Sequence, residues 1–155
     1  MQYDCKNVIN IDGILIGNDN PCYIIAEIGI NHNGNVVLAK KLIDVATSAG
    51  ANAVKFQKRD LESIYQQEIL ENPSLDSQGT EILIDVLKNV EFSEDDFQDI
   101  VNYCKEKKIT FLCTPWDIPS VNFLEKLDVP AYKIASADLT NFPLLAHIST
   151  RTKPI

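Results

Sequence analysis

Short apolar runs alternate with amphipathic stretches along most of the chain. Four runs predict strands, at residues 22–29, 52–57, 109–115 and 130–136. Between and after them, apolar side chains recur every three or four positions, which predicts helices at 35–50, 93–108, 120–128 and 142–150. Four strand–helix units in succession predict parallel strands joined by right-handed crossovers.

Polar residues at the ends of the helical stretches fit these boundaries. Asn35 is suited to cap the start of the first helix, and Gly50 its end. Ser93 and Asp96 have the spacing of a capping box, and Asn141 is placed to cap the last helix. A long connection from residue 58 to 91 holds one further helical pattern at 80–90.

The alternation fits either an open doubly wound sheet or part of a (β/α)8 barrel. The turn after the first strand, GINHNGN, lacks the GxGxxG spacing of a dinucleotide fold, which favours the barrel. Asp12-Gly13 between two apolar stretches predicts a β-hairpin ahead of the first unit. A complete barrel needs about 250 residues. We therefore expect an α/β chain with a hairpin segment at 1–20 and half of a TIM barrel at 21–155.

Charge and composition exclude several classes of partner. The net charge of −8 offers no basic stripe for nucleic acid. No apolar run approaches the roughly 20 residues of a membrane helix, and the first ten residues lack the pattern of a secretion signal. Four cysteines without CxxC spacing indicate reduced thiols, Cys104 and Cys113 among them as core residues. These features predict a cytoplasmic protein.

Each predicted strand carries polar residues near its C-terminal end, where barrels build active sites. They are Glu27 in the first strand, Lys55 and Gln57 in the second, Thr114 in the third, and Lys133 and Ser136 in the fourth. A single lysine at such a place often extends to solvent, but the recurrence on successive strands favours a shared site. Two lysines and one glutamate leave a net positive pocket, which suits a phosphate or carboxylate ligand.

Other residues with chemical potential give weaker signals. His32 lies in a turn, where a hydrogen bond to the backbone is favoured over metal binding because no second ligand is near in sequence. His147 lies among apolar residues of a predicted helix, which favours packing. Trp116 follows the third strand and either lines the mouth of the site or packs under the next helix.

Five segments occur in an order that resembles a known family. They are AEIGINHNG, AVKFQ, FLCTPWD, VPAYKIAS and TNFPLL. Together they resemble the N-acetylneuraminate (sialic acid) synthase family, which includes legionaminic and pseudaminic acid synthases and spore-coat polysaccharide enzymes. The resemblance implies a TIM-barrel transferase of surface polysaccharide biosynthesis, with residues 21–155 as the N-terminal half of its barrel. Such an enzyme condenses phosphoenolpyruvate with the open-chain aldehyde of an N-acylated amino sugar, such as N-acetylmannosamine, to give a nine-carbon 2-keto acid and phosphate.

The resemblance also implies roles for individual residues. Those matching the positions that hold the phosphate and carboxylate of phosphoenolpyruvate are Lys55, Thr114, Lys133 and Ser136. Gln57 matches a contact to the acceptor sugar, and Glu27 the active-site glutamate near the acceptor. Asp138 stands where many members have glutamate, so a catalytic carboxylate is kept on a shorter arm.

Some parts of the implied enzyme have no counterpart in these 155 residues. The family uses a divalent ion, Mn2+ or Mg2+, held by two histidines on later strands, and a C-terminal antifreeze-like domain completes the site of the partner in a homodimer. We therefore expect no metal ligands here and no activity from this segment alone. Two alternatives stay open: a Schiff-base aldolase using Lys55 or Lys133, and a truncated assembly subunit whose strand edges and apolar faces bind another chain.

Overall fold

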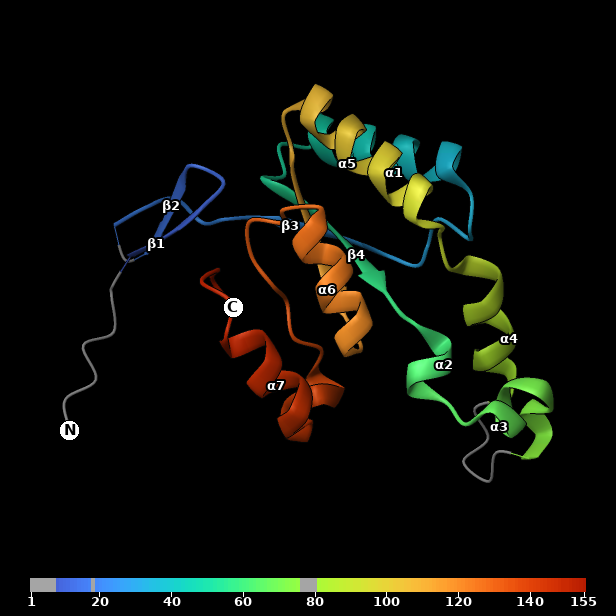
Figure 1. Cartoon of the computed structure of the whole chain (residues 1–155). Helices are drawn as coiled ribbons and strands as arrows, with labels where there is room; N and C mark the ends of the chain where they lie inside the picture. Colours follow the sequence, from blue (N-terminus) through green and yellow to red (C-terminus); the bar gives the residue numbers. More distant parts are fainter. Residues whose placement is uncertain (1–7, 18, 76–80) are drawn as a thin grey trace, which may run out of the picture.

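The computed structural model describes residues 8–17, 19–75 and 81–155, with side chains from residue 83 onward in the last range. Its main sheet holds three parallel strands, β3 (Ile25–Gly29), β4 (Ala53–Lys58) and β5 (Thr110–Pro115), in the order β3-β4-β5. Figure 1 shows this sheet with helices along one side of it. The first three predicted strands and the parallel pairing are thus confirmed. Cys5, Thr80 and the start of the predicted segment 1–20 lie outside the described residues.

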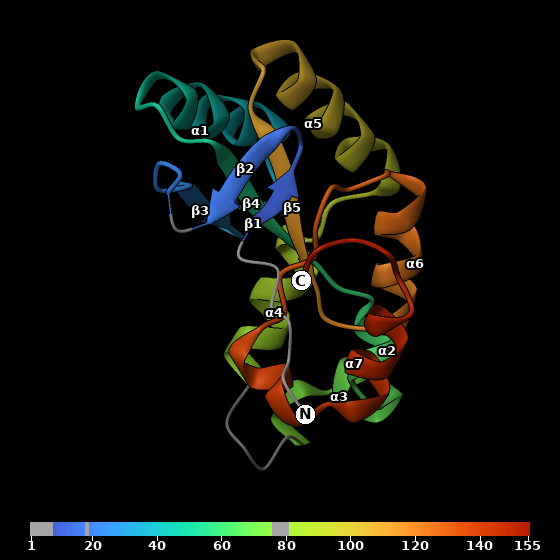
Figure 2. The ribbon, with the colours of Figure 1, turned by 90° about the vertical axis from the view of Figure 1, so that its left-hand side faces the viewer.

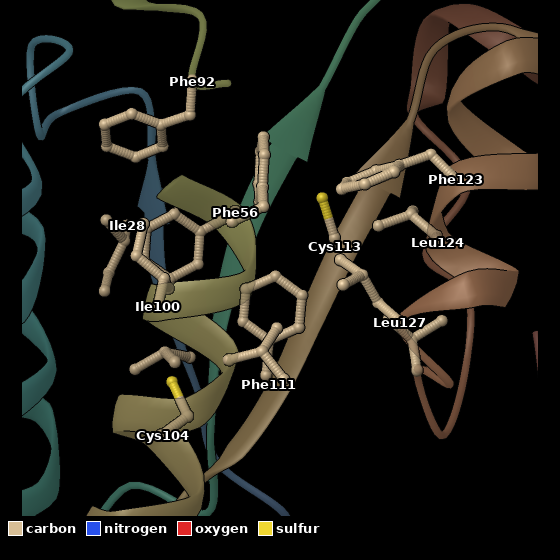
Figure 3. Packing of buried hydrophobic residues seen from close by; sticks show 14 of the residues in the cluster. Ile28, Phe56, Phe92, Ile100, Cys104, Phe111, Cys113, Phe123, Leu124 and Leu127 are labelled. Atoms are coloured by element: carbon tan, nitrogen blue, oxygen red, sulfur yellow. The ribbon is translucent and has the colours of Figure 1, made fainter. Parts of the chain in front are cut away.

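Helices cover one face of the sheet and form the core with it. They are α1 (Val36–Ser48), α5 (Glu94–Lys107), α6 (Ile118–Lys126) and α7 (Phe142–Ser149). The alternation of side chains along a strand sends Val54 and Phe56 to this face, where both are fully buried. Phe56 stacks on Phe111 of β5 with ring centroids 5.5 Å apart. Figure 3 shows these rings between the strands and Ile100 of α5.

A β-hairpin covers part of the opposite face. Strands β1 (Val8–Ile11) and β2 (Ile14–Gly17) pair antiparallel across Asp12-Gly13, both of which have positive φ. A small apolar cluster joins hairpin and strands through Ile11, Ala53, Leu112 and Ala131. The Thr110 hydroxyl, at the start of β5, donates to Asp12 Oδ2 at 2.9 Å. The hairpin therefore lies over the N-terminal part of the strands (Figure 2). It leaves free their C-terminal ends, where Lys55 and Thr114 lie.

The helix boundaries follow the capping residues. The Asn35 side chain accepts from the Leu38 N–H, Ser93 and Asp96 form a capping box, and Asn141 caps α7. Asp117 is a cap that the sequence pattern did not single out. Its carboxylate accepts from the Ser120 N–H of α6 at 2.6 Å and from the Asp60 N–H at 2.7 Å, so it also ties the end of β4 to the start of α6.

The connection after β4 is more helical than the pattern predicted. It contains α2 (Leu61–Ile64), α3 (Gln67–Glu71), the 3-10 turn η1 (Pro73–Leu75) and α4 (Glu81–Val90). Only α4 was predicted, because helices of four or five residues are too short to show a periodic apolar face. Figure 1 shows this connection beyond the end of β4. None of the helices in the described ranges is long and apolar enough to cross a membrane.

The predicted fourth strand, 130–136, is wrong as a strand. It forms one parallel bridge, between Tyr132 and Cys113 of β5, and Ser136–Thr140 is a 3-10 turn, η2. The Tyr132 N–H donates to the Pro154 carbonyl at 2.9 Å, so the last residues of the chain lie alongside this segment. Pro130 has no N–H, and the Ile134 carbonyl accepts from the Lys133 ammonium, so few groups remain for a longer ladder.

Candidate functional site

Three polar side chains meet on the face of the sheet away from the helices. The Lys55 Nζ lies 2.8 Å from Glu27 Oε2 and donates to the Thr114 Oγ1 at 3.1 Å. One side chain comes from each of β3, β4 and β5, so parallel pairing of the strands brings them together. The prediction that Glu27, Lys55 and Thr114 share a site is consistent with this geometry.

The burial of these groups differs, and this decides what the site can bind. Lys55 is 6% exposed and Thr114 3%, whereas the Glu27 side chain is 60% exposed. An unpaired ammonium at such depth would cost several kcal/mol. The Glu27 carboxylate offsets this cost. Because it stays hydrated, its own desolvation penalty is small. The trio therefore presents a fixed cation under an open edge, where an anion or a hydroxyl group can join it.

Gln57 is the next residue of β4 on the same face as Lys55. It is held by Arg59, a residue that the sequence pattern did not single out. Arg59 Nη2 donates to Gln57 Oε1, and the guanidinium lies over the Trp116 ring, 4.2 Å from its centroid. Arg59 is 7% exposed, and burial lowers the pKa of its guanidinium, an effect that nearby Glu91 opposes. Trp116 thus packs against Arg59. Its position was the one sequence signal that could have identified Arg59, because it continues the odd-numbered series of Lys55 and Gln57.

An ion pair fixes the backbone just after β4. The Lys58 Nζ lies 2.9 Å from Glu91 Oε1, with both side chains largely buried. The same Glu91 oxygen accepts from the Arg59 N–H at 3.2 Å. Because Glu91 follows α4, this contact ties the end of the long connection to the strand that carries Lys55.

The remaining predicted residues lie on the segment after β5. Lys133 and Ser136 are exposed, and the Lys133 ammonium donates to the Ile134 carbonyl at 2.6 Å. Asp138 is 7% exposed, and its Oδ1 accepts from the Asn141 side-chain amide at 2.9 Å. Asp138 and Trp116 line a hollow of about 610 Å3 together with the start of α6. Among the described residues, no hydrogen bond or ion pair connects Lys133, Ser136 or Asp138 to the Glu27–Lys55–Thr114 trio.

The two histidines occupy structural places. His32 is 2% exposed and stacks on Phe92 with ring centroids 4.0 Å apart. Its Nδ1 accepts from the Gly34 N–H at 3.2 Å, which confirms the predicted backbone hydrogen bond. Burial lowers the pKa of His32 to about 4, against the opposing effect of a backbone hydrogen bond with Gly29. The His147 ring nitrogen Nε2 lies 2.9 Å from Asn122 Oδ1 on the surface side of α6 and α7.

The sequence profile of the NeuB family matches residues 42–155, which is well over half of the chain. The chain belongs to the NeuB family. Human N-acetylneuraminate-9-phosphate synthase is 37% identical to it over 145 residues, 92% of this chain and 40% of that protein. The N,N'-diacetyllegionaminic acid synthase of Legionella pneumophila is 34% identical over 141 residues, 90% of this chain and 40% of that protein.

A solved structure matches the fold of this NeuB-family chain. The N-acetylneuraminic acid synthetase of Leptospira borgpetersenii, in a crystal structure with citrate, superposes with a TM-score of 0.79 at 35% identity. The superposition covers 92% of this chain and 46% of that one. The chain spans about 40% of the length of the curated relatives it matches.

The divalent ion implied by the family resemblance does not fit the part of this NeuB chain that the structure describes. Residues 8–17, 19–75 and 83–155 contain no group of three or more His, Cys, Asp or Glu side chains able to hold a metal. The ring of His32 is enclosed by Phe92, and Glu27 is engaged with Lys55.

Two cysteines of this NeuB chain are core residues, as predicted. Cys104 is 1% exposed on α5, and burial raises its pKa to about 12. Cys113 is fully buried on the helix-covered face of β5, and burial raises its pKa further. Thiols so far from their thiolate form are poor nucleophiles, so neither is a candidate for the chemistry of the site.

The pKa of His32 predicts a loss of stability in mild acid. Its folded-state value of about 4 lies below the ordinary 6.5, so the unfolded chain takes up the proton first as the pH falls. The contribution is complete above pH 6.5 and is lost progressively down to about pH 4. We expect the free energy of unfolding in urea to fall by about 2 kcal/mol from this group between pH 7 and 5.

A pair of variants isolates this contribution from that of the carboxylates. His32→Gln should remove this part of the pH dependence, and His147→Gln, in the half-buried network on α7, should keep it. An identical pH dependence in His32→Gln and the parent protein would contradict the assignment.

Proposed function

We propose that this chain forms the N-terminal half of the (β/α)8 barrel of a phosphoenolpyruvate-condensing nonulosonic acid synthase. The observation that carries the proposal is the buried Lys55 ammonium, held by Glu27 and Thr114 at the C-terminal ends of parallel strands in a NeuB-family chain. Barrel enzymes place their catalytic groups at that end of the strands.

The proposed reaction needs cations for a trianionic substrate. Carbon 3 of phosphoenolpyruvate adds to the acceptor aldehyde, water adds to carbon 2, and inorganic phosphate leaves as the 2-keto acid forms. Lys55 would neutralise the phosphate or carboxylate group and stabilise the developing charge on the leaving phosphate. Thr114 fixes the direction of the ammonium, because its hydroxyl oxygen accepts a hydrogen bond from it. Lys133 and Ser136, both exposed, would add further contacts to the anion.

The carboxylates have separate places in this scheme. Glu27, with its exposed oxygens, would orient a hydroxyl group of the acceptor or the attacking water. Asp138 is the second catalytic candidate, and its burial together with the hydrogen bond from Asn141 fixes one of its two oxygens. Gln57 would contact the acceptor sugar.

The names and ligands of the relatives support the substrate classes. The Leptospira relative was crystallised in complex with citrate, a polycarboxylate. Relatives named for N-acetylneuraminate 9-phosphate and N,N'-diacetyllegionaminic acid support an N-acylated amino sugar as acceptor. We further propose a homodimer, a divalent ion held by residues other than those described here, and a role in surface polysaccharide biosynthesis. The unbridged thiols of Cys22, Cys104 and Cys113 support a cytoplasmic location.

Phosphate release from phosphoenolpyruvate tests the proposal. In the protein at its full natural length, we expect inorganic phosphate to appear only when an N-acylated mannosamine or a related amino sugar is supplied. Lys133→Ala should lower kcat/KM for phosphoenolpyruvate by about 10- to 100-fold, the worth of one charge-assisted hydrogen bond. Unchanged turnover in this variant would remove Lys133 from the site.

Borohydride trapping distinguishes the Schiff-base alternative. The Lys55 ammonium is engaged with Glu27 and Thr114, whereas a Schiff base requires a free amine. We expect no stable adduct after reduction in the presence of a keto acid. A covalent adduct on Lys55 or Lys133 would replace the proposed reaction with aldolase chemistry.

A further inference from the structure

Arg59 is a buried cation, and removing a charge from water raises the free energy of folding unless partners offset it. The guanidinium is buried and forms no ion pair within 4.0 Å among the described residues. Its Nη1 has no hydrogen-bond partner in the described part of the chain. A buried cation with so few partners contributes little to folding stability. Its position at the mouth of the strands therefore points to a role in the site.

The contacts of Arg59 fix it from three sides. Its backbone N–H donates to Glu91, its guanidinium lies on the Trp116 ring, and its Nη2 donates to the Gln57 side chain. A guanidinium held 4.2 Å from the centroid of an indole ring gains a cation–π attraction, which is favourable for arginine in particular. Arg59 is thus a rigid partner for the amide of Gln57.

The chemistry of the guanidinium decides which way the Gln57 amide faces. Every polar hydrogen-bonding group of arginine is a donor, so the amide atom that faces it must be the oxygen. The amide nitrogen Nε2 then lies on the other side. A Cβ built on Gly29, the last residue of β3, would lie 3.5 Å from this nitrogen, so Nε2 lies beside the end of β3, two residues beyond Glu27.

We propose that Arg59 is a positioning residue that makes Gln57 a hydrogen-bond donor to the acceptor substrate. Without Arg59 the amide is free to turn by 180° and to present its oxygen instead. With Arg59 in place, Nε2 presents two N–H groups toward the mouth, and these select an acceptor that offers an oxygen there, such as the carbonyl of an N-acyl group or a sugar hydroxyl. This inference rests on the proposed function for the identity of the substrate.

Steady-state kinetics separate this role from a merely structural one. In the protein at its full natural length, Arg59→Met should raise KM for the amino sugar about tenfold, the worth of one hydrogen bond, and leave KM for phosphoenolpyruvate within about twofold. Arg151→Met is the matched control. The Arg151 guanidinium donates a hydrogen bond to Asn122 of α6, so its loss should change neither the KM for the amino sugar nor the KM for phosphoenolpyruvate. An unchanged acceptor KM in Arg59→Met, or an equal rise in both constants, would overturn the proposal.

Gln57→Glu keeps the proposal testable if Arg59→Met does not fold. A carboxylate at position 57 still accepts from Arg59, so the fold and Tm should be retained, but the donor group is gone. We expect the acceptor KM to rise about tenfold in this variant as well. Acceptor binding as tight as in the parent protein would show that no donor is needed at position 57.

A melting-temperature cycle decides the contact without any substrate. The Tm losses of Gln57→Ala and Arg59→Met should sum to more than the loss in the double variant, because either single change already breaks the bond. Additive losses would show that Arg59 does not hold Gln57. If the parent protein releases no phosphate from phosphoenolpyruvate, the proposed function fails by itself, and this cycle still decides the role of Arg59 toward Gln57.

Discussion

Replacing Lys55 with methionine is expected to lower kcat/KM for phosphoenolpyruvate by roughly 10²- to 10³-fold in the protein at its full natural length. The variant loses the one ammonium that Glu27 and Thr114 hold beneath the open edge of the site. Its fold should survive, because methionine matches the lysine stem in length and the exposed Glu27 carboxylate can remain in water. Phosphate release measures the first effect, and thermal melting measures the second.

Lys126→Met is the control for this substitution. It makes the same change of charge on an exposed residue in the last turn of α6, away from the strand ends. Turnover in Lys126→Met should equal that of the parent protein. If Lys55→Met retained full activity while melting at a much lower temperature, the Lys55 ammonium would be a structural group and the site assignment would fail.

Gly34→Ala should cause the largest loss of stability among single-methyl additions in the described turns. Gly34 has φ +69°, and a Cβ there would lie 2.4 Å from the backbone carbonyl oxygen of Asn89 at the end of α4. The left-handed conformation alone costs an alanine roughly 1–2 kcal/mol. Because the obstacle is backbone, α4 must move away, and we expect a total cost of about 2–4 kcal/mol, seen as a Tm loss of roughly 5–15 °C.

Gly50→Ala isolates the contribution of the clash. Gly50, just past α1, has φ +80°, but a Cβ there meets no atom within 4 Å. It should therefore lose only the conformational part of the cost. Equal Tm losses in Gly34→Ala and Gly50→Ala would show that α4 does not rest on the turn at Gly34.

Local signals were sufficient to predict most of the fold. The caps at Asn35, Ser93 and Asn141 act within one turn of their own helix, so the sequence around them contains all of the required information. The failure at 130–136 has the opposite cause. A strand needs backbone partners from elsewhere in the chain, and its alternating pattern cannot reveal that Tyr132 is its only bridge to β5.

The candidate site, too, could be predicted from the sequence only in part. Glu27, Lys55 and Thr114 could be grouped in advance, because parallel strands bring residues near their C-terminal ends together. The contact of Arg59 with Trp116 could not, since it depends on how the chain turns after β4 and after β5. The exposed position of Lys133 depends in turn on the strand that did not form.

The even-numbered and odd-numbered residues of β4 face opposite sides of the sheet and have different roles. Val54 and Phe56 fill the core under the helices, while Lys55 and Gln57 look toward the opposite side. A substitution at position 55 or 57 therefore changes the candidate site without removing a side chain from the core, and a substitution at position 54 or 56 does the reverse.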